Sequence, residues 1–264
     1  MPTRTEADTL PTYPDLPGKV AVVTGGSGGI GAATCRLLAE SGAKVAVNGR
    51  DEEAIRAVVE EVRERGGEAV GAAADVTDFA AIEQMRERVE AEFGPVDVLV
   101  ALAGGGIVRP GPTAQITEEE WHSVVDGNLT ATFLTLKSFL PAMIERKRGS
   151  IVTMASTAAR LPSGAPAPYA AAKAGIAMLS RHVANEVGEH GVRVNCVSPS
   201  SILTERTGRL MSEDQQRQVA AMHPLGRLGA PEDVGLATLF LASESSSSWL
   251  TGLTLDVAGG RIML

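Results

Sequence analysis

The sequence is poor in cysteine and aromatic residues, has no long apolar run and carries no excess of positive charge. Two cysteines among 264 residues, Cys35 and Cys196, are too few for a disulfide framework. No apolar run approaches the ~18 residues that span a bilayer, so we expect no membrane segment. The net charge is −8, and an acidic surface makes nucleic acid an unfavourable partner.

The first residues of the chain do not have the pattern of a targeting segment, and the histidines do not have the pattern of a metal site. Residues 1–17 are polar with four prolines and lack both the apolar core of a signal peptide and the Arg-rich helix of a transit peptide. We therefore expect a flexible N-terminal extension over 1–17, a single domain over 18–264 and a cytoplasmic protein. No metal site is expected, because metal-ligand spacing is absent from the four histidines, which are His122, His182, His190 and His223.

Short apolar runs alternate with helical patterns along the chain. The predicted strands are 19–24, 44–48, 68–74, 96–102, 150–154, 192–197 and 253–257. The predicted helices are 29–41, 51–65, 79–93, one or two over 117–143, 169–189, 212–221 and 231–242. This alternation predicts an α/β fold, a single Rossmann-type doubly wound parallel sheet of about seven strands with helices on both faces. Break-prone stretches at 104–112, 161–168 and 198–223 follow predicted strands, where ligands bind in such sheets.

A glycine-rich run, TGGSGGIG at 24–31, follows the first predicted strand and opens the first predicted helix. Gly25 would permit a tight turn, and Gly29 and Gly31 would let the backbone approach a pyrophosphate. Free N–H groups at the helix start and the helix dipole favour phosphate there. The run predicts a dinucleotide-binding loop, although a flexible turn without a ligand would have the same composition. The residues assigned to the loop are Thr24, Gly25, Ser27, Gly28, Gly29, Ile30 and Gly31.

A tyrosine and a lysine stand four residues apart in the motif YAAAK, as Tyr169 and Lys173. On a helix this spacing puts both side chains on one face. A neighbouring ammonium lowers the pKa of a phenol towards the working pH and makes it a better proton-transfer group. Ser156 stands thirteen residues before Tyr169, just after the fifth predicted strand, and can hydrogen-bond a substrate oxygen. The spacing alone would equally suit a surface Tyr–Lys pair on an ordinary helix.

These motifs together resemble the short-chain dehydrogenase/reductase family, including its 3-oxoacyl-carrier-protein reductases and related ketoreductases. The glycine spacing after Thr24 matches, as does the order Asn128, Ser156, Tyr169, Lys173. The resemblance assigns proton transfer to Tyr169 and orientation of the carbonyl to Ser156. It assigns to Lys173 the contact with the nicotinamide ribose and the tuning of Tyr169. It also implies that Asn128 holds a water in a proton relay.

The resemblance extends to other segments over roughly residues 16–260. It implies cofactor contacts at Asp75 and Val76 beside the adenine, at Ala103 and Gly104 after the fourth strand, and at Pro199, Ile202 and Thr204 near the nicotinamide amide. Two departures from the family pattern are visible. Residues 101–104 read ALAG where the family usually has NNAG, and Ser200 stands where a glycine is usual.

The end of the second strand predicts the choice of cofactor. A carboxylate there bonds the ribose 2′-hydroxyl of NAD, whereas an arginine accommodates the 2′-phosphate of NADP. The NAD-selecting aspartate would fall at Gly49, and Arg50 follows directly, with Asn48 as a second contact. The other interpretation is that Arg50 pairs with Glu52 or Glu53. The glycine loop has no basic residue of its own, yet the pattern favours NADP(H) over NAD(H).

The expected function is an NADP(H)-dependent reduction of a ketone to a secondary alcohol. The small-molecule substrate would be a 3-oxoacyl thioester or a ring or secondary-metabolite ketone. Two alternatives stay open: the same chemistry run as an alcohol oxidation, and a dinucleotide-binding protein without turnover. The resemblance implies a homotetramer. The basic run at 146–148 could attract an acyl carrier protein, but Asn185 stands where such reductases tend to have arginine.

Overall fold

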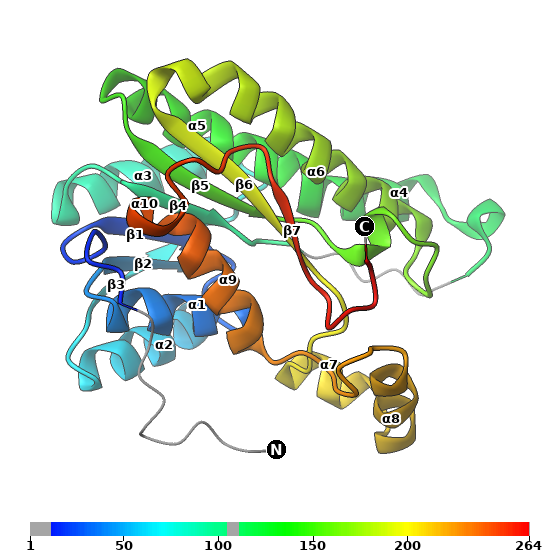
Figure 1. Cartoon of the computed structure of the whole chain (residues 1–264). Coiled ribbons are helices and arrows are strands. Elements are labelled where there is room, and N and C mark those ends of the chain that lie inside the picture. The colour runs from blue at the N-terminus through cyan, green and yellow to red at the C-terminus, as the bar shows by residue number, and fades with distance from the viewer. Residues whose placement is uncertain (1–11, 105–110, 264) are drawn as a thin grey trace.

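The computed structural model describes residues 12–104 and 111–263. Seven strands form one parallel sheet in the order β3-β2-β1-β4-β5-β6-β7 (Figure 1). The strands are β1 (Val20–Thr24), β2 (Lys44–Gly49), β3 (Glu68–Ala73), β4 (Val98–Ala101), β5 (Gly149–Met154), β6 (Val192–Pro199) and β7 (Thr254–Val257). The order reverses beside β1, as in doubly wound folds, which confirms the predicted fold class.

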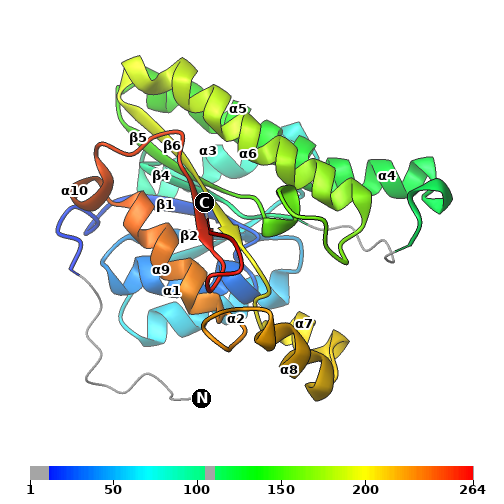
Figure 2. The same ribbon diagram turned by 45° about the vertical axis from the view of Figure 1, so that its right-hand side comes forward.

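Helices cover both faces of the sheet (Figures 1 and 2). One layer consists of α1 (Gly29–Glu40), α2 (Glu52–Glu64) and α9 (Pro231–Ala242). The other consists of α3 (Phe79–Phe93), α5 (Ala131–Glu145) and α6 (Ala167–Val187). The shorter helices are α4 (Glu118–Val125), α7 (Glu205–Leu210), α8 (Glu213–Ala221) and α10 (Glu244–Ser247), with short turns η1 (Thr113–Gln115), η2 (Asp126–Thr130), η3 (Thr157–Ala159) and η4 (Gly188–His190).

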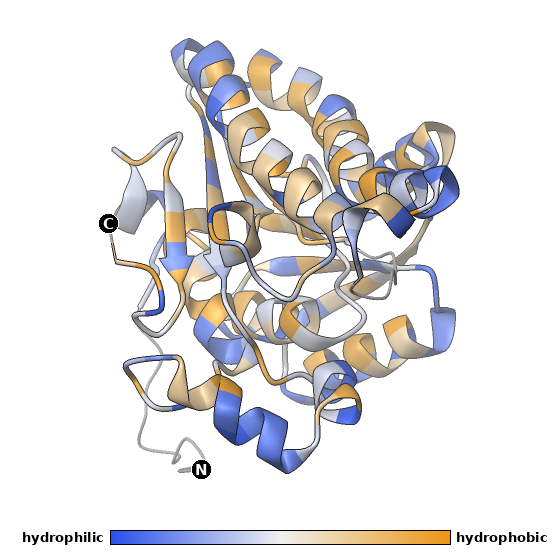
Figure 3. Ribbon diagram, turned by 90° about the vertical axis from the view of Figure 1, so that its right-hand side faces the viewer, coloured by the Kyte–Doolittle hydropathy of each residue, from blue (hydrophilic) through white to orange (hydrophobic). Residues whose placement is uncertain are grey.

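Local sequence accounts for these elements. Helix α2 begins after Asp51, whose carboxylate accepts hydrogen bonds from the backbone N–H groups of Glu53 and Ala54. Strand β1 alternates between two cores, because Ala21 and Val23 pack under α1 and α2 whereas Val20 and Val22 pack under α3 and α5. In Figure 3 the strands and inner helix faces are largely hydrophobic and the outer helix turns are largely hydrophilic.

The segment predicted as one or two helices over 117–143 contains an unexpected turn. Helix α4 and helix α5 are joined by the π-helical turn η2, without a loop between them. Such turns are rare and often lie at functional sites. Within the stretch expected to be break-prone, 198–223, the structure adds α7, which the sequence did not predict. The stretch 104–112 falls mostly on residues 105–110, which lie outside the described residues.

The N-terminal segment is packed from residue 13 onward. Tyr13 and Leu16 are buried in the core under α1 and α9. The Asp15 carboxylate accepts hydrogen bonds from the hydroxyl of Ser243 and the backbone N–H of Glu244, at the start of α10. The expectation of a flexible segment over 1–17 therefore does not hold for these residues, whose apolar side chains the surrounding prolines obscured. Residues 1–11 lie outside the described residues.

Two further expectations concern cysteines and membranes. Cys35 and Cys196 are both buried free thiols, one in α1 and one in β6. Across residues 12–104 and 111–263, no helix has the length and apolar character needed to cross a membrane.

Candidate active site

The glycine-rich loop between β1 and α1 lies against the end of β4. Gly25 has a φ of 68°, and a Cβ on it would lie 3.0 Å from the Cα of Ala103. A Cβ on Gly31 would lie 2.7 Å from the carbonyl carbon of Gly25 and 2.9 Å from the Cα of Gly26. Because backbone forms these neighbours, only glycine fits at either position. The loop is thus a close-packed backbone surface at the carboxyl edge of the sheet.

A cavity of about 800 Å³ opens beside this loop. Among the predicted cofactor residues, it is lined by Gly25, Ser27, Asn48, Arg50, Asp75, Val76, Ala103 and Gly104. Its size is within the range of small-molecule and cofactor sites. Ser123, Gly127 and Thr130 also line it, although the sequence predicted only a helix for these residues. Their spacing of three to four residues, around Asn128, was the signal that could have found them.

Arg50 and Asp75 face each other across the cavity wall. The Arg50 side chain is 80% exposed, and its guanidinium lies 3.8 Å from the Asp75 carboxylate and forms this ion pair in place of the one considered with Glu52 or Glu53. Hydrogen bonds from the backbone N–H and hydroxyl of Thr77 lower the pKa of Asp75, and the Arg50 charge adds to this effect. Arg50 is thus a solvent-accessible cation at the rim of the cavity.

Asn48 is placed differently from Arg50. Its side chain is buried, and its amide nitrogen donates to the backbone carbonyls of Ala72 at 2.8 Å and Ala74 at 3.2 Å. An amide nitrogen has two hydrogens, so both are engaged by the end of β3. Asn48 therefore braces β2 against β3, and of the two phosphate contacts expected from the sequence only Arg50 has free donors facing the cavity.

Tyr169 and Lys173 lie on one face of α6, as their spacing predicts. The Lys173 ammonium is 5.6 Å from the centre of the Tyr169 ring and donates to the carbonyl oxygen of Met154 at 3.0 Å. Lys173 is 2% exposed, and burial lowers its pKa to about 8. Ser156 follows β5, and its hydroxyl accepts from the backbone N–H of Ala158 at 3.2 Å. The three side chains thus converge where β5 and α6 meet.

The ionisation of Tyr169 reflects its surroundings. Burial raises the pKa of the Tyr169 phenol, while hydrogen bonding with Ser156 and the positive charge of Arg206 act in the opposite direction. The sequence predicted that Lys173 would lower this pKa. In the structure the cation that lowers it is Arg206 on α7, which the sequence did not single out. The net effect is a phenol that stays protonated at neutral pH.

Asn128 joins this group from the π-helical turn. The residue is fully buried, and its amide nitrogen donates to the carbonyl of Val124 at 2.9 Å. A Cβ on Gly104 would lie 2.7 Å from the Asn128 Oδ1 and 3.4 Å from the Lys173 Nζ. Both polar atoms therefore face the same point beside the cavity, and the absence of a side chain at residue 104 keeps that point open.

The segment after β6 closes the site from the other side. Ile202 is buried, and the Thr204 hydroxyl caps α7 by accepting from the Thr207 backbone N–H at 3.2 Å. A Cβ on Gly29 would lie 3.2 Å from the Thr204 methyl carbon. Pro199 ends β6. The structure therefore brings the two outer cofactor motifs of the sequence together, because the start of α7 lies next to the loop of residues 24–31.

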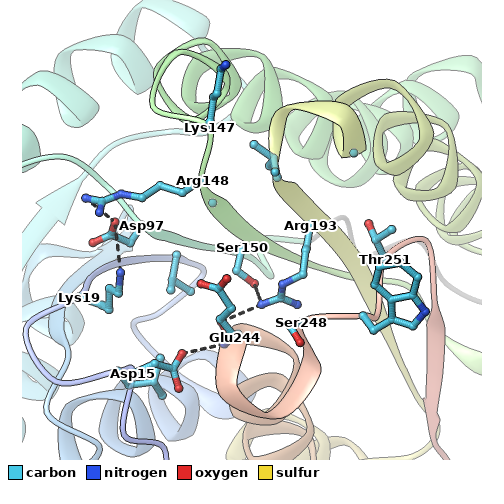
Figure 4. A pocket seen from close by; sticks show the side chains of 18 residues that line it. Asp15, Lys19, Asp97, Lys147, Arg148, Ser150, Arg193, Glu244, Ser248 and Thr251 are labelled. Atoms are coloured by element: carbon cyan, nitrogen blue, oxygen red, sulfur yellow. Dashed lines mark hydrogen bonds and ion pairs between the residues drawn. The ribbon is translucent and has the colours of Figure 1, made fainter.

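A second cavity, of about 420 Å³, lies at the opposite edge of the sheet (Figure 4). Its charged groups contact one another: Asp97 lies 3.9 Å from Lys19 and 3.4 Å from Arg148. Arg193 donates to the Ser150 hydroxyl at 3.1 Å and to backbone carbonyls of α9. These pairs hold strand ends to the surrounding segments, and none of the predicted site residues lies there.

Comparison with known proteins identifies the family of the chain. A sequence profile described as "short chain dehydrogenase" matches residues 19–215. The chain is 39% identical over 247 residues to the 3-oxoacyl-[acyl-carrier-protein] reductase FabG of Escherichia coli, covering 94% of this chain and 98% of that protein. It is also 39% identical over 243 residues to the (2S)-[(R)-hydroxy(phenyl)methyl]succinyl-CoA dehydrogenase subunit BbsD of Thauera aromatica, covering 92% and 96%.

A solved structure shows the same fold. A putative gluconate dehydrogenase from Agrobacterium tumefaciens superposes with a TM-score of 0.90 at 32% identity, over 96% of this chain and all of that one. The profile match covers well over half of the chain, and the relatives align over nearly their whole lengths. The chain therefore belongs to the short-chain dehydrogenase family of oxidoreductases.

Proposed function

We propose that the protein is an NADP(H)-dependent oxidoreductase that reduces a ketone to a secondary alcohol, with Tyr169 as proton donor. The observation that carries this proposal is the convergence of Tyr169, Ser156 and Lys173, with the Lys173 ammonium directed at Gly104, which lines the cavity beside the glycine loop. The named relatives act on a 3-oxoacyl group held by an acyl carrier protein and on a hydroxylated acyl-CoA. Both names fit the interconversion of a ketone and an alcohol.

Each side chain of the site has a separate role in the proposed reduction. Bound NADPH would supply the hydride to the carbonyl carbon. The Tyr169 hydroxyl donates its proton to the carbonyl oxygen, and its raised pKa keeps that proton in place beforehand. The Ser156 hydroxyl donates a hydrogen bond to the same oxygen and stabilises its developing negative charge. Lys173, with a pKa near the working pH, returns a proton to Tyr169, and Asn128 orients the route to solvent.

The rim of the cavity supports NADP(H) over NAD(H). Arg50 is an exposed guanidinium at the end of β2, and Gly49 offers no carboxylate to repel a 2′-phosphate. The loop's glycines make a backbone cradle for the pyrophosphate. The remaining predicted contacts are Asp75 and Val76 at the cavity wall, and Ile202 and Thr204 in the segment that approaches Gly29 of the glycine loop.

Two extensions concern partners. The exposed apolar side chains of Phe133 on α5 and Met178 on α6 support the expected homotetramer, with these helices at one interface. An acyl carrier protein is less well supported, because Arg146 and Arg148 of the basic run are both paired with Asp97. Lys147 is then the main cation of that run left to attract an acidic carrier.

Steady-state kinetics test the proposal. NADPH or NADH consumption would be followed with a short 3-oxoacyl thioester and with a panel of ring ketones, in wild type and Tyr169→Phe. We expect NADPH-linked turnover of at least one ketone class and a loss of about 10²–10⁴-fold in kcat for Tyr169→Phe, since the proton donor is removed. The variant should still bind NADPH. Unchanged turnover by Tyr169→Phe would refute the assignment, and dinucleotide binding without turnover of any ketone or alcohol would favour the non-catalytic alternative.

A further inference from the structure

The segment between Ile202 and His223 is unusual in how little of it is buried. Every residue of 203–222, which carry α7 and α8, is partly or fully exposed, whereas Ile202 is 7% and His223 is 3% exposed. Figures 1 and 2 show the two helices side by side, projecting from the carboxyl end of β6. We call residues 203–222 the flap. With no buried side chain of its own, the flap depends on its two buried ends for its position.

His223 makes two directed hydrogen bonds at the base of the flap. Its Nδ1 lies 2.8 Å from the backbone oxygen of Val219, and its Nε2 lies 2.9 Å from the Ser200 hydroxyl. A carbonyl oxygen only accepts, so Nδ1 carries the hydrogen and, in the neutral ring, Nε2 accepts from the Ser200 hydroxyl. Val219 belongs to α8, whereas Ser200 directly follows β6. The imidazole therefore connects the flap to the end of the strand.

Other bonds at the base involve backbone groups, and the Thr207 hydroxyl adds one by donating to the carbonyl of Ile202 at 2.8 Å. The N–H of Leu203 donates to the carbonyl of Gly229, and the N–H of Gly229 donates to the carbonyl of Ser201. These bonds align the chain before the flap with the chain well after it. They do not reach α8, whose last turn is joined to the end of β6 through the Ser200–His223 side-chain pair, while the N–H of Leu225 just beyond it donates to the carbonyl of Gly259.

We propose that Ser200 and His223 are positioning residues whose hydrogen bond holds the flap over the reacting end of the cofactor cavity and thereby sets the KM for the ketone. The inference rests on the proposed function. Two observations place the flap there: Thr204 at its start lies so near the glycine loop that a Cβ on Gly29 would be 3.2 Å from its methyl carbon, and the charge of Arg206 acts on Tyr169. The flap also exposes the apolar side chains of Leu210 and Met222, which would face a substrate when the flap is held in place.

Three substitutions separate the two bonds of the imidazole. Ser200→Ala removes the hydroxyl, and His223→Asn retains a donor near Val219 but does not reach Ser200. His223→Gln does the reverse, because its longer amide reaches Ser200. We expect Ser200→Ala and His223→Asn to raise the ketone KM about three- to tenfold, the equivalent of one net hydrogen bond, with kcat within about twofold. His223→Gln should retain most of the wild-type KM.

Hydrogen–deuterium exchange gives a readout that needs no substrate. Amides of 205–222 should exchange faster in Ser200→Ala and His223→Asn than in wild type, while amides of β1 and α1 keep their rates. Ser212→Ala is the matched control, because Ser212 caps α8 by accepting from the Gln215 N–H without touching the base of the flap. It should speed exchange at the start of α8 and leave KM near the wild-type value.

Several results would overturn the inference. Wild-type KM and exchange in Ser200→Ala would show that the bond does not position the flap. An equal rise in KM for Ser212→Ala would assign the effect to general loosening of α8. If wild type turned over no ketone at all, the proposed function would fail, whereas unchanged flap exchange in Ser200→Ala would still refute the positioning role independently.

Discussion

The glycine loop and the flap bound the same proposed cofactor from two sides, and they are built in contrasting ways. The loop is fixed by backbone packed on backbone, so that Gly25 and Gly31 have no room for a methyl group. The flap, by contrast, has no buried residue between Ile202 and His223. A surface that recognises one invariant ligand can be rigid, whereas a surface that admits substrates must open. We therefore expect the flap to set specificity for the ketone and the loop to set affinity for the dinucleotide.

The rigidity of the loop can be broken by one methyl group. In Gly31→Ala the new Cβ would collide with the Gly25 carbonyl group, and overpacking of this kind costs about 1–3 kcal/mol. We expect the NADPH dissociation constant to rise about 10- to 100-fold. Fluorescence titration measures this effect. Gly188→Ala is the control, because a Cβ there meets open space among the described residues and its φ of −59° suits alanine. Equal NADPH affinity in wild type and Gly31→Ala would contradict the close-packed loop.

The pH dependence of kcat/KM tests the role of Lys173, which lies between the glycine loop and the flap. Lys173 is cationic below its pKa of about 8 and neutral above it. If the ammonium is the form that returns a proton to Tyr169, kcat/KM for reduction should be level below pH 8 and fall about tenfold per pH unit above it. Lys173→Arg keeps the charge at all these pH values, so its lower activity should no longer show that fall. A fall at the same pH in both proteins would assign the titration to another group.

We expect Arg50, at the rim of the cofactor cavity, to determine the preference for NADPH over NADH. Arg50→Ala removes the exposed guanidinium, and we expect the KM for NADPH to rise about tenfold because one charge-assisted contact is lost. The KM for NADH should change little, since NADH has no 2′-phosphate. Arg56→Ala, at another exposed position on α2, is the matched control for loss of a positive charge. Parallel rises for both cofactors in Arg50→Ala would argue against phosphate recognition.

The smallest expected effect is on the free energy of unfolding, which should depend little on the flap and strongly on the core. Leu210 on the flap is 72% exposed, so Leu210→Ala should change the free energy of unfolding by less than about 0.5 kcal/mol. Leu38 in α1 is fully buried, and Leu38→Ala should cost about 2–5 kcal/mol. Urea denaturation of both variants measures the difference. A large loss for Leu210→Ala would mean that the flap is packed more tightly than its exposure indicates.

Local patterns predicted much of the fold and the centre of the site. The apolar strand at 19–24, the glycines after it and the spacing of Tyr169 and Lys173 all follow from short-range chemistry, and each lies where the pattern indicates. The assigned roles of these side chains remain predictions. Helix α7 was missed because it has only six residues, a glycine among them and no buried face.

Two contacts of the site that the sequence did not predict share a long-range cause. Asn48 was expected to face a phosphate, but its amide is engaged by Ala72 and Ala74, whose position depends on the pairing of β2 with β3. Arg206 affects Tyr169 although the two are 37 positions apart in the sequence. Neither contact has a signature within a short window of sequence, because each is created only when distant elements meet.

The π-helical turn at 126–130 has a consequence for how the chain could change in length. An α-helix advances about 100° per residue, so one additional residue in a turn rotates everything after it by that angle. Helix α4 packs against α6, whereas α5 packs against α3. The π-helical turn rotates α5 relative to α4, so that the two joined helices can pack against these different neighbours. Deleting a single residue there would swing Phe139 and Met143 out of the core. The number of residues in the turn is therefore fixed by the packing of the helices on either side of it. Insertions and deletions should be tolerated in the flap but not in this turn.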